Sequence, residues 1–259
     1  MMKSTVLITG ASGGIGLALA KLFAQDQHNL VLVARSEDKL NEIAQDLSKK
    51  HSIKVNVIVS DLSKPQAAKQ LFEETKRRGL VIDSLINNAG FGLFGEFEKT
   101  DMQRELEMIQ VNITAVTELS KYFGQEMVER KQGQVLNVAS TAAFQPGPLM
   151  AVYYATKAYV LSFSEALSNE WKDSGITVSA LCPGPTSTGF GDQAELGQSK
   201  LFKSGVMDAE SVARKAYEGL KQEKTVVIPG MKNKILAKAV RLMPRSIVPS
   251  IVRKAQDRV

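Results

Sequence analysis

Seven short apolar runs, separated by longer segments of helical period, constrain the fold of this chain more than any other feature. The hydrophobicity of Val6-Leu7-Ile8 and Val31-Leu32-Val33 is continuous, as in strands that helices cover on both faces. The pattern therefore predicts one α/β domain with a doubly wound parallel sheet of about seven strands. The runs predicted as strands are Ser4–Thr9, Asn29–Ala34, Lys54–Val59, Ser84–Asn87, Gln134–Ala139, Ile176–Leu181 and Thr225–Ile228.

Composition excludes several classes of protein. The 259 residues, 44% of them hydrophobic, can bury a full core. Cys182 is the single cysteine and cannot form an internal disulfide, and the two histidines have no Cys or acidic cluster around them that would predict a metal site. The first apolar run is too short for a signal peptide, and no stretch is long enough to span a bilayer, so we expect a soluble cytoplasmic protein.

The net charge of +6 is distributed unevenly. Residues 231–259 hold eight basic residues and one acidic residue, which leaves 25 basic and 26 acidic residues in positions 1–230. We therefore expect one folded domain at 1–230, followed by a basic amphipathic extension at 231–259. A nucleic-acid-binding protein would carry its positive patch on the folded body, so this distribution argues against nucleic acid as a partner.

A glycine-rich turn follows the first strand and opens a helix. In such a turn Gly10 permits the tight bend, Gly14 lets the backbone approach a pyrophosphate, and Gly16 lets the helix pack closely. The turn predicts a Rossmann-type dinucleotide site that also includes Ser12 and Ile15. The alternative is a plain strand-to-helix turn.

The end of the second strand indicates which dinucleotide binds. An NAD site presents Asp or Glu there to the adenosine ribose, whereas this strand ends in Ala34-Arg35. A guanidinium can bind a phosphate through two hydrogen bonds, so Arg35 favours the 2′-phosphate of NADP(H). The alternative is that Arg35 is a solvated residue at the start of the next helix.

A tyrosine and a lysine four residues apart provide a candidate acid/base pair. Tyr153 and Lys157 lie near the start of the helical stretch that runs from Ala151 to about Lys172, so both project from one face. We expect the ammonium of Lys157, together with a positive nicotinamide, to lower the pKa of the tyrosine. Tyr154 is the competing candidate, but its neighbour four residues on is Ala158. The alternative is that Tyr153 is an exposed aromatic residue and Lys157 is simply its neighbour on the helix.

Four motifs in order and spacing resemble those of the short-chain dehydrogenase/reductase family, over essentially the whole length to about Gly230. They are Thr9-Gly10-x-x-x-Gly14-x-Gly16, Asn87-Asn88-Ala89-Gly90, Ser140 with Tyr153-x-x-x-Lys157, and Pro183-Gly184. Each motif alone is modest evidence, and together they are specific.

The resemblance implies a role for each matching residue. Tyr153 would exchange the proton with the substrate oxygen, Ser140 would hold that oxygen, and Lys157 would bind the nicotinamide ribose. Asn112 would hold a water of a proton relay through its backbone carbonyl, or would be a helix-interior asparagine without a role. The remaining residues would bind the cofactor: Asp61 and Leu62 at the adenine, Asn88, Ala89 and Gly90 along the cleft, and Pro183, Gly184 and Thr188 near the carboxamide.

Two departures from the family pattern matter. Gly13 stands where many NADP-using members have a basic residue, so phosphate binding would depend mainly on Arg35, with Ser12 as a further contact. The segment beyond Gly230 is longer than in the compact ketoacyl-carrier reductases of the family. The glycine-containing stretch Thr186–Gly205 is a candidate lid.

Apolar residues around the tyrosine are candidates for a substrate wall, and ordinary core or dimer packing is the alternative for each. They are Phe91, Phe94, Phe144, Leu149, Met150, Phe190, Leu201 and Phe202.

The sequence thus predicts an NADP(H)-dependent oxidoreductase for an apolar carbonyl or secondary alcohol, working as a homodimer or homotetramer. Alternatives are a 3-oxoacyl-carrier-protein reductase and a non-catalytic redox sensor. In the extension, a helix over Lys234–Met243 would place Lys234, Lys238 and Arg241 opposite an apolar face, with Pro244 and Pro249 interrupting it. That apolar face would pack on the body or a second subunit, or would rest on anionic lipid.

Overall fold

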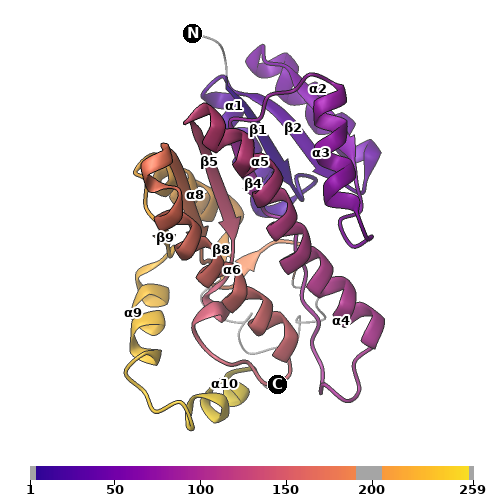
Figure 1. Ribbon diagram of the computed structural model, residues 1–259. Coiled ribbons are helices and arrows are strands. Elements are labelled where there is room, and N and C mark those ends of the chain that lie inside the picture. Colours follow the sequence, from indigo (N-terminus) through magenta and orange to yellow (C-terminus); the bar gives the residue numbers. More distant parts are fainter. Residues whose placement is uncertain (1–3, 191–205, 257–259) are drawn as a thin grey trace.

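Seven strands form one parallel sheet in the order β3-β2-β1-β4-β5-β6-β9 (Figure 1), in a computed structural model that describes residues 4–190 and 206–256. This architecture confirms the predicted doubly wound α/β fold. The strands are β1 (Thr5–Thr9), β2 (Asn29–Ala34), β3 (Val55–Val59), β4 (Ser84–Asn87), β5 (Gly133–Val138), β6 (Ile176–Leu181) and β9 (Val226–Val227).

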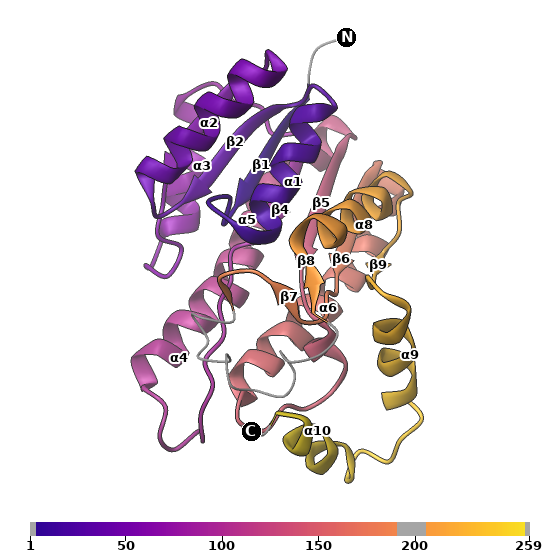
Figure 2. The same ribbon diagram turned by 180° about the vertical axis from the view of Figure 1, so that it is seen from behind.

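Helices cover both faces of the sheet (Figures 1 and 2), which explains the continuous hydrophobicity of its strands. Val6 and Ile8 pack on one side, while Leu7 between them packs on the other, and all three are fully buried. Burial contributes about 1.5–3 kcal/mol for each such side chain. One face carries α1 (Gly14–Gln25), α2 (Glu37–His51) and α8 (Ala209–Lys221), and the other carries α3 (Ala67–Arg77), α5 (Val116–Arg130) and α6 (Ala151–Glu170).

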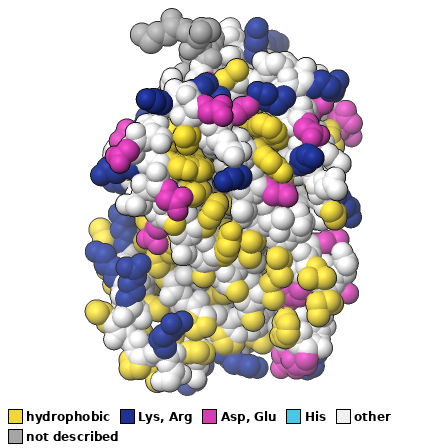
Figure 3. Space-filling view, in the orientation of Figure 1, with side chains coloured by type: hydrophobic (Ala, Val, Ile, Leu, Met, Phe, Trp, Pro, Cys, Tyr) yellow, Lys and Arg dark blue, Asp and Glu magenta, His cyan; other side chains and the backbone are white. Residues whose placement is uncertain are grey.

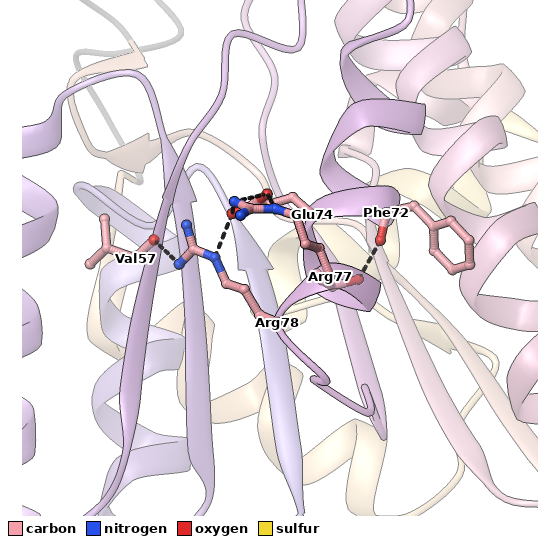
Figure 4. A network of polar contacts seen from close by, with 6 residues as sticks. Val57, Phe72, Glu74, Arg77 and Arg78 are labelled. Carbon is pink, nitrogen blue, oxygen red and sulfur yellow. Dashed lines mark hydrogen bonds and ion pairs between the residues drawn. The ribbon is translucent and has the colours of Figure 1, made fainter.

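A network of polar contacts fastens the end of α3 to the edge strand β3 (Figure 4). Glu74 accepts hydrogen bonds from both Arg77 and Arg78. The guanidinium of Arg78 also donates to the carbonyl oxygen of Val57 at 2.9 Å. The arginine thus occupies a backbone acceptor at an edge of the sheet, where an unpaired strand would otherwise be free to pair with another chain.

The sheet order changes direction between β1 and β4, from which the chain leaves for opposite sides of the sheet. In open α/β sheets, ligands bind outside the carboxyl ends of the strands at such a switch point. The fold therefore places a binding site where the loops after β1 and β4 meet.

The segment after β9 forms two helices, α9 (Met231–Val240) and α10 (Val248–Gln256), which extend below the sheet in Figure 1. Two details of the prediction for this segment were wrong. Pro244 lies between the helices as expected, but Pro249 lies in the first turn of α10, where proline is tolerated because that N–H has no intrahelical partner. In addition, the residues predicted to share one apolar face do not share one environment: Ala239 and Met243 line the pocket, whereas Ile235 is 60% exposed.

Two further features complete the fold. A short parallel pair that sequence analysis did not predict joins β7 (Thr186–Ser187) to β8 (Met207–Asp208). Across the two described stretches, no helix has the length and apolar character that crossing a bilayer requires.

Candidate active site

A pocket of about 1320 Å³ opens at the carboxyl ends of the strands. It brings together nearly all of the site residues predicted from the sequence. Those lining it are Gly10, Ser12, Gly14, Ile15, Arg35, Asp61, Leu62, Asn88, Ala89, Gly90, Ser140, Tyr153, Lys157, Pro183, Gly184 and Thr188. Gly16 and Asn112 lie behind this lining.

The glycine-rich turn is held tightly against the loop after β4. Gly10 has a φ of +65°, and a Cβ there would lie 2.8 Å from the amide nitrogen of Asn88. That amide donates to the carbonyl oxygen of Thr9 at 2.9 Å. A Cβ on Gly16 would lie 2.4 Å from the carbonyl oxygen of Gly10. Glycine is therefore required at both positions, and the turn leaves room for a backbone-bound pyrophosphate at the start of α1.

Positive side chains line the end of the pocket beside β2 and β3. Arg35 follows β2, and Lys39 lies in the first turn of α2. Asp61, after β3, accepts hydrogen bonds from the backbone and side chain of Ser63. Burial acts to raise the pKa of Asp61, but the bonds from Ser63 and the nearby Arg35 outweigh it and lower the pKa. The carboxylate is thus ionised and already bonded, and the two cations remain at the pocket wall.

Ser140, Tyr153 and Lys157 come together from two elements. Ser140 begins a short 3-10 turn (Thr141–Phe144), where its hydroxyl accepts a hydrogen bond from the Ala142 N–H at 3.1 Å. Tyr153 and Lys157 project from the first two turns of α6, and both are almost fully buried. The Lys157 Nζ donates to the carbonyl oxygen of Val138 at 2.9 Å and lies 5.8 Å from the centre of the Tyr153 ring.

Burial sets the protonation of this pair. It raises the pKa of Tyr153, and the opposing effect of a hydrogen bond with Ser140 is smaller. The ammonium of Lys157 is directed at the carbonyl oxygen of Val138. The expected lowering of the tyrosine pKa by Lys157 together with a positive nicotinamide stays a prediction. Burial also lowers the pKa of Lys157 to about 8. At neutral pH the tyrosine is therefore a phenol that can donate a proton.

Asn112 acts as a structural anchor beside the pair. It lies in a π-helical segment (Gln110–Ala115) between α4 (Met102–Ile109) and α5, and it is fully buried. Its side-chain amide exchanges hydrogen bonds with the backbone of Phe91 and donates to Thr156 at 3.1 Å. These contacts fasten the loop after β4 to α6. Sequence analysis did not predict this structural role of the side chain. The contact between the Asn112 backbone carbonyl and a water stays a prediction.

The loop after β6 closes the other end of the pocket. A Cβ on Gly14 would lie 3.0 Å from the Thr188 methyl group, so Thr188 faces the glycine-rich turn. A Cβ on Gly184 would lie 2.6 Å from the amide of Asn233 in α9. The first residues after β9 therefore help to shape the site.

Only some of the residues predicted to form a substrate wall line the pocket. Phe91, Met150 and Phe190 line the pocket, whereas Phe94, Phe144 and Leu149 do not. Leu201 and Phe202, and most of the candidate lid, lie outside the described residues.

Sequence analysis missed much of the pocket wall. The largest omission concerns the C-terminal segment. Packing of its apolar face on the body beside the substrate cleft was one expected alternative, but its residues could not be assigned to the pocket without knowing how α9 and α10 return to the body. Lys39 was also missed, although its spacing of four from Arg35 was a usable signal. The omitted residues of α9, α10 and their connection are Asn233, Leu236, Ala237, Ala239, Val240, Met243, Ile251, Val252 and Ala255.

Residues 4–198 match the family model "short chain dehydrogenase". The chain belongs to the short-chain dehydrogenase/reductase family. Members of this family are oxidoreductases that act on carbonyl or alcohol groups with a nicotinamide cofactor, and the fold and the grouped motifs agree with that assignment.

Among curated relatives, the chain is 33% identical to the 17-beta-hydroxysteroid dehydrogenase type 3 of Mus musculus over 72% of its length. It is also 33% identical to a very-long-chain 3-oxoacyl-CoA reductase of the same species over 68% of its length. The aligned regions span only 61% and 57% of those two proteins. The ketoacyl reductase HetN of Nostoc sp. is 30% identical, over 92% of this chain and 82% of that protein.

Solved structures of similar proteins cover the chain more completely. A short-chain dehydrogenase from Sphingobium yanoikuyae in complex with NADPH is 32% identical, with a TM-score of 0.85 and 98% coverage of both chains. An alcohol dehydrogenase from Comamonas testosteroni, described as specific for bulky-bulky ketones, is 30% identical, with a TM-score of 0.79 and 93% coverage of both. The whole chain, α9 and α10 included, therefore has counterparts of known structure.

Proposed function

We propose that this protein is an NADPH-dependent reductase of bulky, largely apolar ketones. The observation that carries the proposal is the grouping of Ser140, Tyr153 and Lys157 in one pocket with Arg35 and Lys39 at its far end. The first three residues suit carbonyl reduction, and the two cations suit a cofactor that ends in a 2′-phosphate. The NADPH complex of the Sphingobium protein supports the choice of cofactor.

Each residue of the group would have a separate role in reducing the carbonyl. When bound, NADPH supplies a hydride to the carbonyl carbon. Ser140 donates a hydrogen bond to the carbonyl oxygen and positions it, and Tyr153 gives its phenolic proton to the same oxygen as negative charge develops there. The Lys157 ammonium holds the nicotinamide ribose and favours the phenolate that remains after proton transfer. Gly10, Gly14 and the start of α1 hold the pyrophosphate.

The shape of the pocket supports an apolar substrate. Next to Tyr153 the wall consists of Phe91, Met150 and Phe190, and the other side is formed by apolar residues of α9 and α10. Such a wall favours a ketone with apolar groups on both sides of the carbonyl. The relatives are named for hydroxysteroids, very-long-chain 3-oxoacyl-CoA and bulky ketones, and these substrates are large and mostly apolar.

The decisive test is Tyr153→Phe, assayed by NADPH oxidation with a panel of ketones. Loss of the phenol should reduce turnover by at least a thousandfold, since general acid catalysis contributes on the order of 10²–10⁴ and carbonyl polarisation is lost with it. NADPH binding, followed by fluorescence, should be unchanged. Tyr159→Phe, on an exposed turn of the same helix, is the matched control and should keep full activity.

A Tyr153→Phe activity within tenfold of the parent would refute the assignment of the acid. If the parent protein binds NADPH but reduces no ketone and no thioester, the redox-sensor alternative replaces the enzyme.

The second candidate substrate is a 3-oxoacyl thioester, because two of the relatives are named as reductases of such compounds. Comparing kcat/KM for a 3-oxoacyl-CoA, a 3-oxoacyl-carrier protein and a bulky ketone separates the candidates. A preference for either thioester of tenfold or more would move the assignment to acyl reduction.

We also propose that the enzyme is a homo-oligomer of the cytoplasm. Met102 and Leu106 lie one turn apart on α4 and are 63% and 51% exposed, which suits burial against a second copy. Light scattering of the purified protein should give the mass of a dimer or tetramer, and Leu106→Arg should reduce it.

A further inference from the structure

An apolar ridge on α9 faces away from the body. Met231 and Ile235 lie one turn apart, and Leu242 continues the row just beyond the helix end. They are 70%, 60% and 89% exposed. None of them lines the pocket, which is formed by Leu236, Val240 and other residues on the opposite side of the helix. The helix therefore has a second apolar face that the folded body does not use.

Basic side chains border the ridge on both sides. At 100° per residue, Lys234 and Lys238 fall on one flank of the ridge and Lys232 on the other. No carboxylate within residues 4–190 and 206–256 forms an ion pair with these three lysines. Figure 3 shows basic and hydrophobic side chains lying side by side over this part of the surface.

The same segment reaches the rim of the pocket. Leu236 and Ile251 line the pocket and are also 54% and 50% exposed, so they stand where it opens to solvent. Of the twelve large hydrophobic side chains that are exposed in the described part of the chain, six belong to residues 231–251. An apolar surface thus continues from the ridge toward the entrance.

We propose that α9 and its basic flanks form a docking surface for an anionic lipid membrane. An apolar row with lysines on both sides matches a helix that lies in the interface plane, with its hydrocarbon side chains inserted and its ammonium groups at the headgroups. A second protein copy carrying the same positive charge would be repelled here, which favours lipid over self-association. Docking would bring the rim of the pocket to the membrane surface, where apolar ketones dissolve.

Co-sedimentation with vesicles tests the inference on the full chain. The protein should bind vesicles of phosphatidylcholine with phosphatidylserine at low salt, bind phosphatidylcholine alone much more weakly, and be released as salt screens the charges. Because the assay measures binding and not turnover, its result is independent of the proposed function.

Two pairs of substitutions separate the two contributions. Ile235→Gln with Leu242→Gln should weaken binding to both kinds of vesicle by about tenfold or more, since two inserted apolar side chains are lost. Lys234→Gln with Lys238→Gln should weaken binding to the anionic vesicles by about 30-fold, as each basic residue near such a surface contributes about 1 kcal/mol.

Matched controls lie elsewhere on the surface. Val81→Gln removes a similarly exposed apolar side chain, and Lys49→Gln with Lys50→Gln removes two exposed lysines from α2. Both should bind vesicles like the parent, and thermal melting should show that all variants are folded. The inference is overturned if the parent ignores anionic vesicles at low salt or if the controls lose binding equally. It is also overturned if the ridge variants lower the molecular mass in solution without changing vesicle binding, because a second copy would then be the occupant.

Discussion

At the scale of single residues, the proposed preference for NADPH depends on Arg35 and Lys39, which both line the pocket. We predict that Arg35→Ala weakens NADPH binding at least tenfold and leaves NADH binding nearly unchanged. A charge-assisted hydrogen bond contributes about 1.5–3 kcal/mol, and Lys39 retains part of the phosphate contact. Fluorescence titration with both cofactors measures the effect. Equal losses for NADPH and NADH would instead mean that Arg35 has a structural role.

The pKa of Lys157 leads us to expect that the proposed reaction depends on pH. Its pKa of about 8 means that the ammonium is present below pH 8 and is lost as the pH rises through that value. Tyr153 stays protonated over the same range, because burial raises its pKa. We therefore predict that kcat/KM for ketone reduction falls as the pH increases from 7 to 9.5, with the break near 8. A flat profile over this range would show that the ammonium is not required.

The sequence identified residue types and spacings well and their electrostatics poorly. The spacing of four between Tyr153 and Lys157 places both on one face of a helix in any context. Whether burial or a neighbouring charge dominates the tyrosine pKa depends on how much protein surrounds the phenol and where Nζ points. Neither quantity is local in sequence, so sequence analysis did not predict that burial raises the pKa of this tyrosine. Lys39 was missed because it belongs to no motif, although it lies four residues after Arg35.

At the scale of elements, α10 is attached to the catalytic helix through Gln256. The Gln256 side chain is fully buried and donates a hydrogen bond to the hydroxyl of Tyr154, next to the proposed acid. Val248 and Val252 are buried on the same face of α10. The helix thereby fixes the apolar side of the pocket.

We predict that Gln256→Ala raises KM for a bulky ketone several-fold while the Kd for NADPH stays the same. The change leaves the buried Tyr154 hydroxyl with one partner fewer, which costs about 1–3 kcal/mol and loosens α10. Steady-state kinetics and cofactor titration give the two constants. If the affinity for NADPH falls as much as that for the ketone, α10 supports the whole domain and not the substrate side.

The helices of the C-terminal segment also show where hydrophobic periodicity alone does not predict which face of a helix is buried. Strands and helices up to β9 follow from hydrophobic patterns that a parallel sheet must show. α9 carries apolar residues on two sides, and only the fold reveals that Leu236 and Val240 face the pocket while Ile235 faces solvent. A helical wheel drawn from the sequence does not distinguish the face toward the pocket from the face toward solvent.

At the scale of the whole molecule, the loops that follow β1, β2, β4, β5 and β6 line one pocket, so a cofactor bound there would connect them. We predict that NADPH at about 100 times its Kd raises the stability by about 2.7 kcal/mol, which corresponds to a rise in Tm of roughly 5–10 °C for a protein of this size. Differential scanning fluorimetry checks this. NADH at the same concentration should give a clearly smaller shift, and equal shifts would contradict the preference for NADPH.

The position of α9 and α10 along the chain also has a consequence for biosynthesis. Residues 231–256 emerge from the ribosome after every strand of the sheet, so the dinucleotide-binding half can fold while this segment is still being translated. The part of the pocket wall that α9 and α10 form is thus synthesised after the loops that carry the dinucleotide motifs. Until α10 has been synthesised, Tyr154 and Phe91 lack the cover that Val248 and Val252 give them in the folded protein.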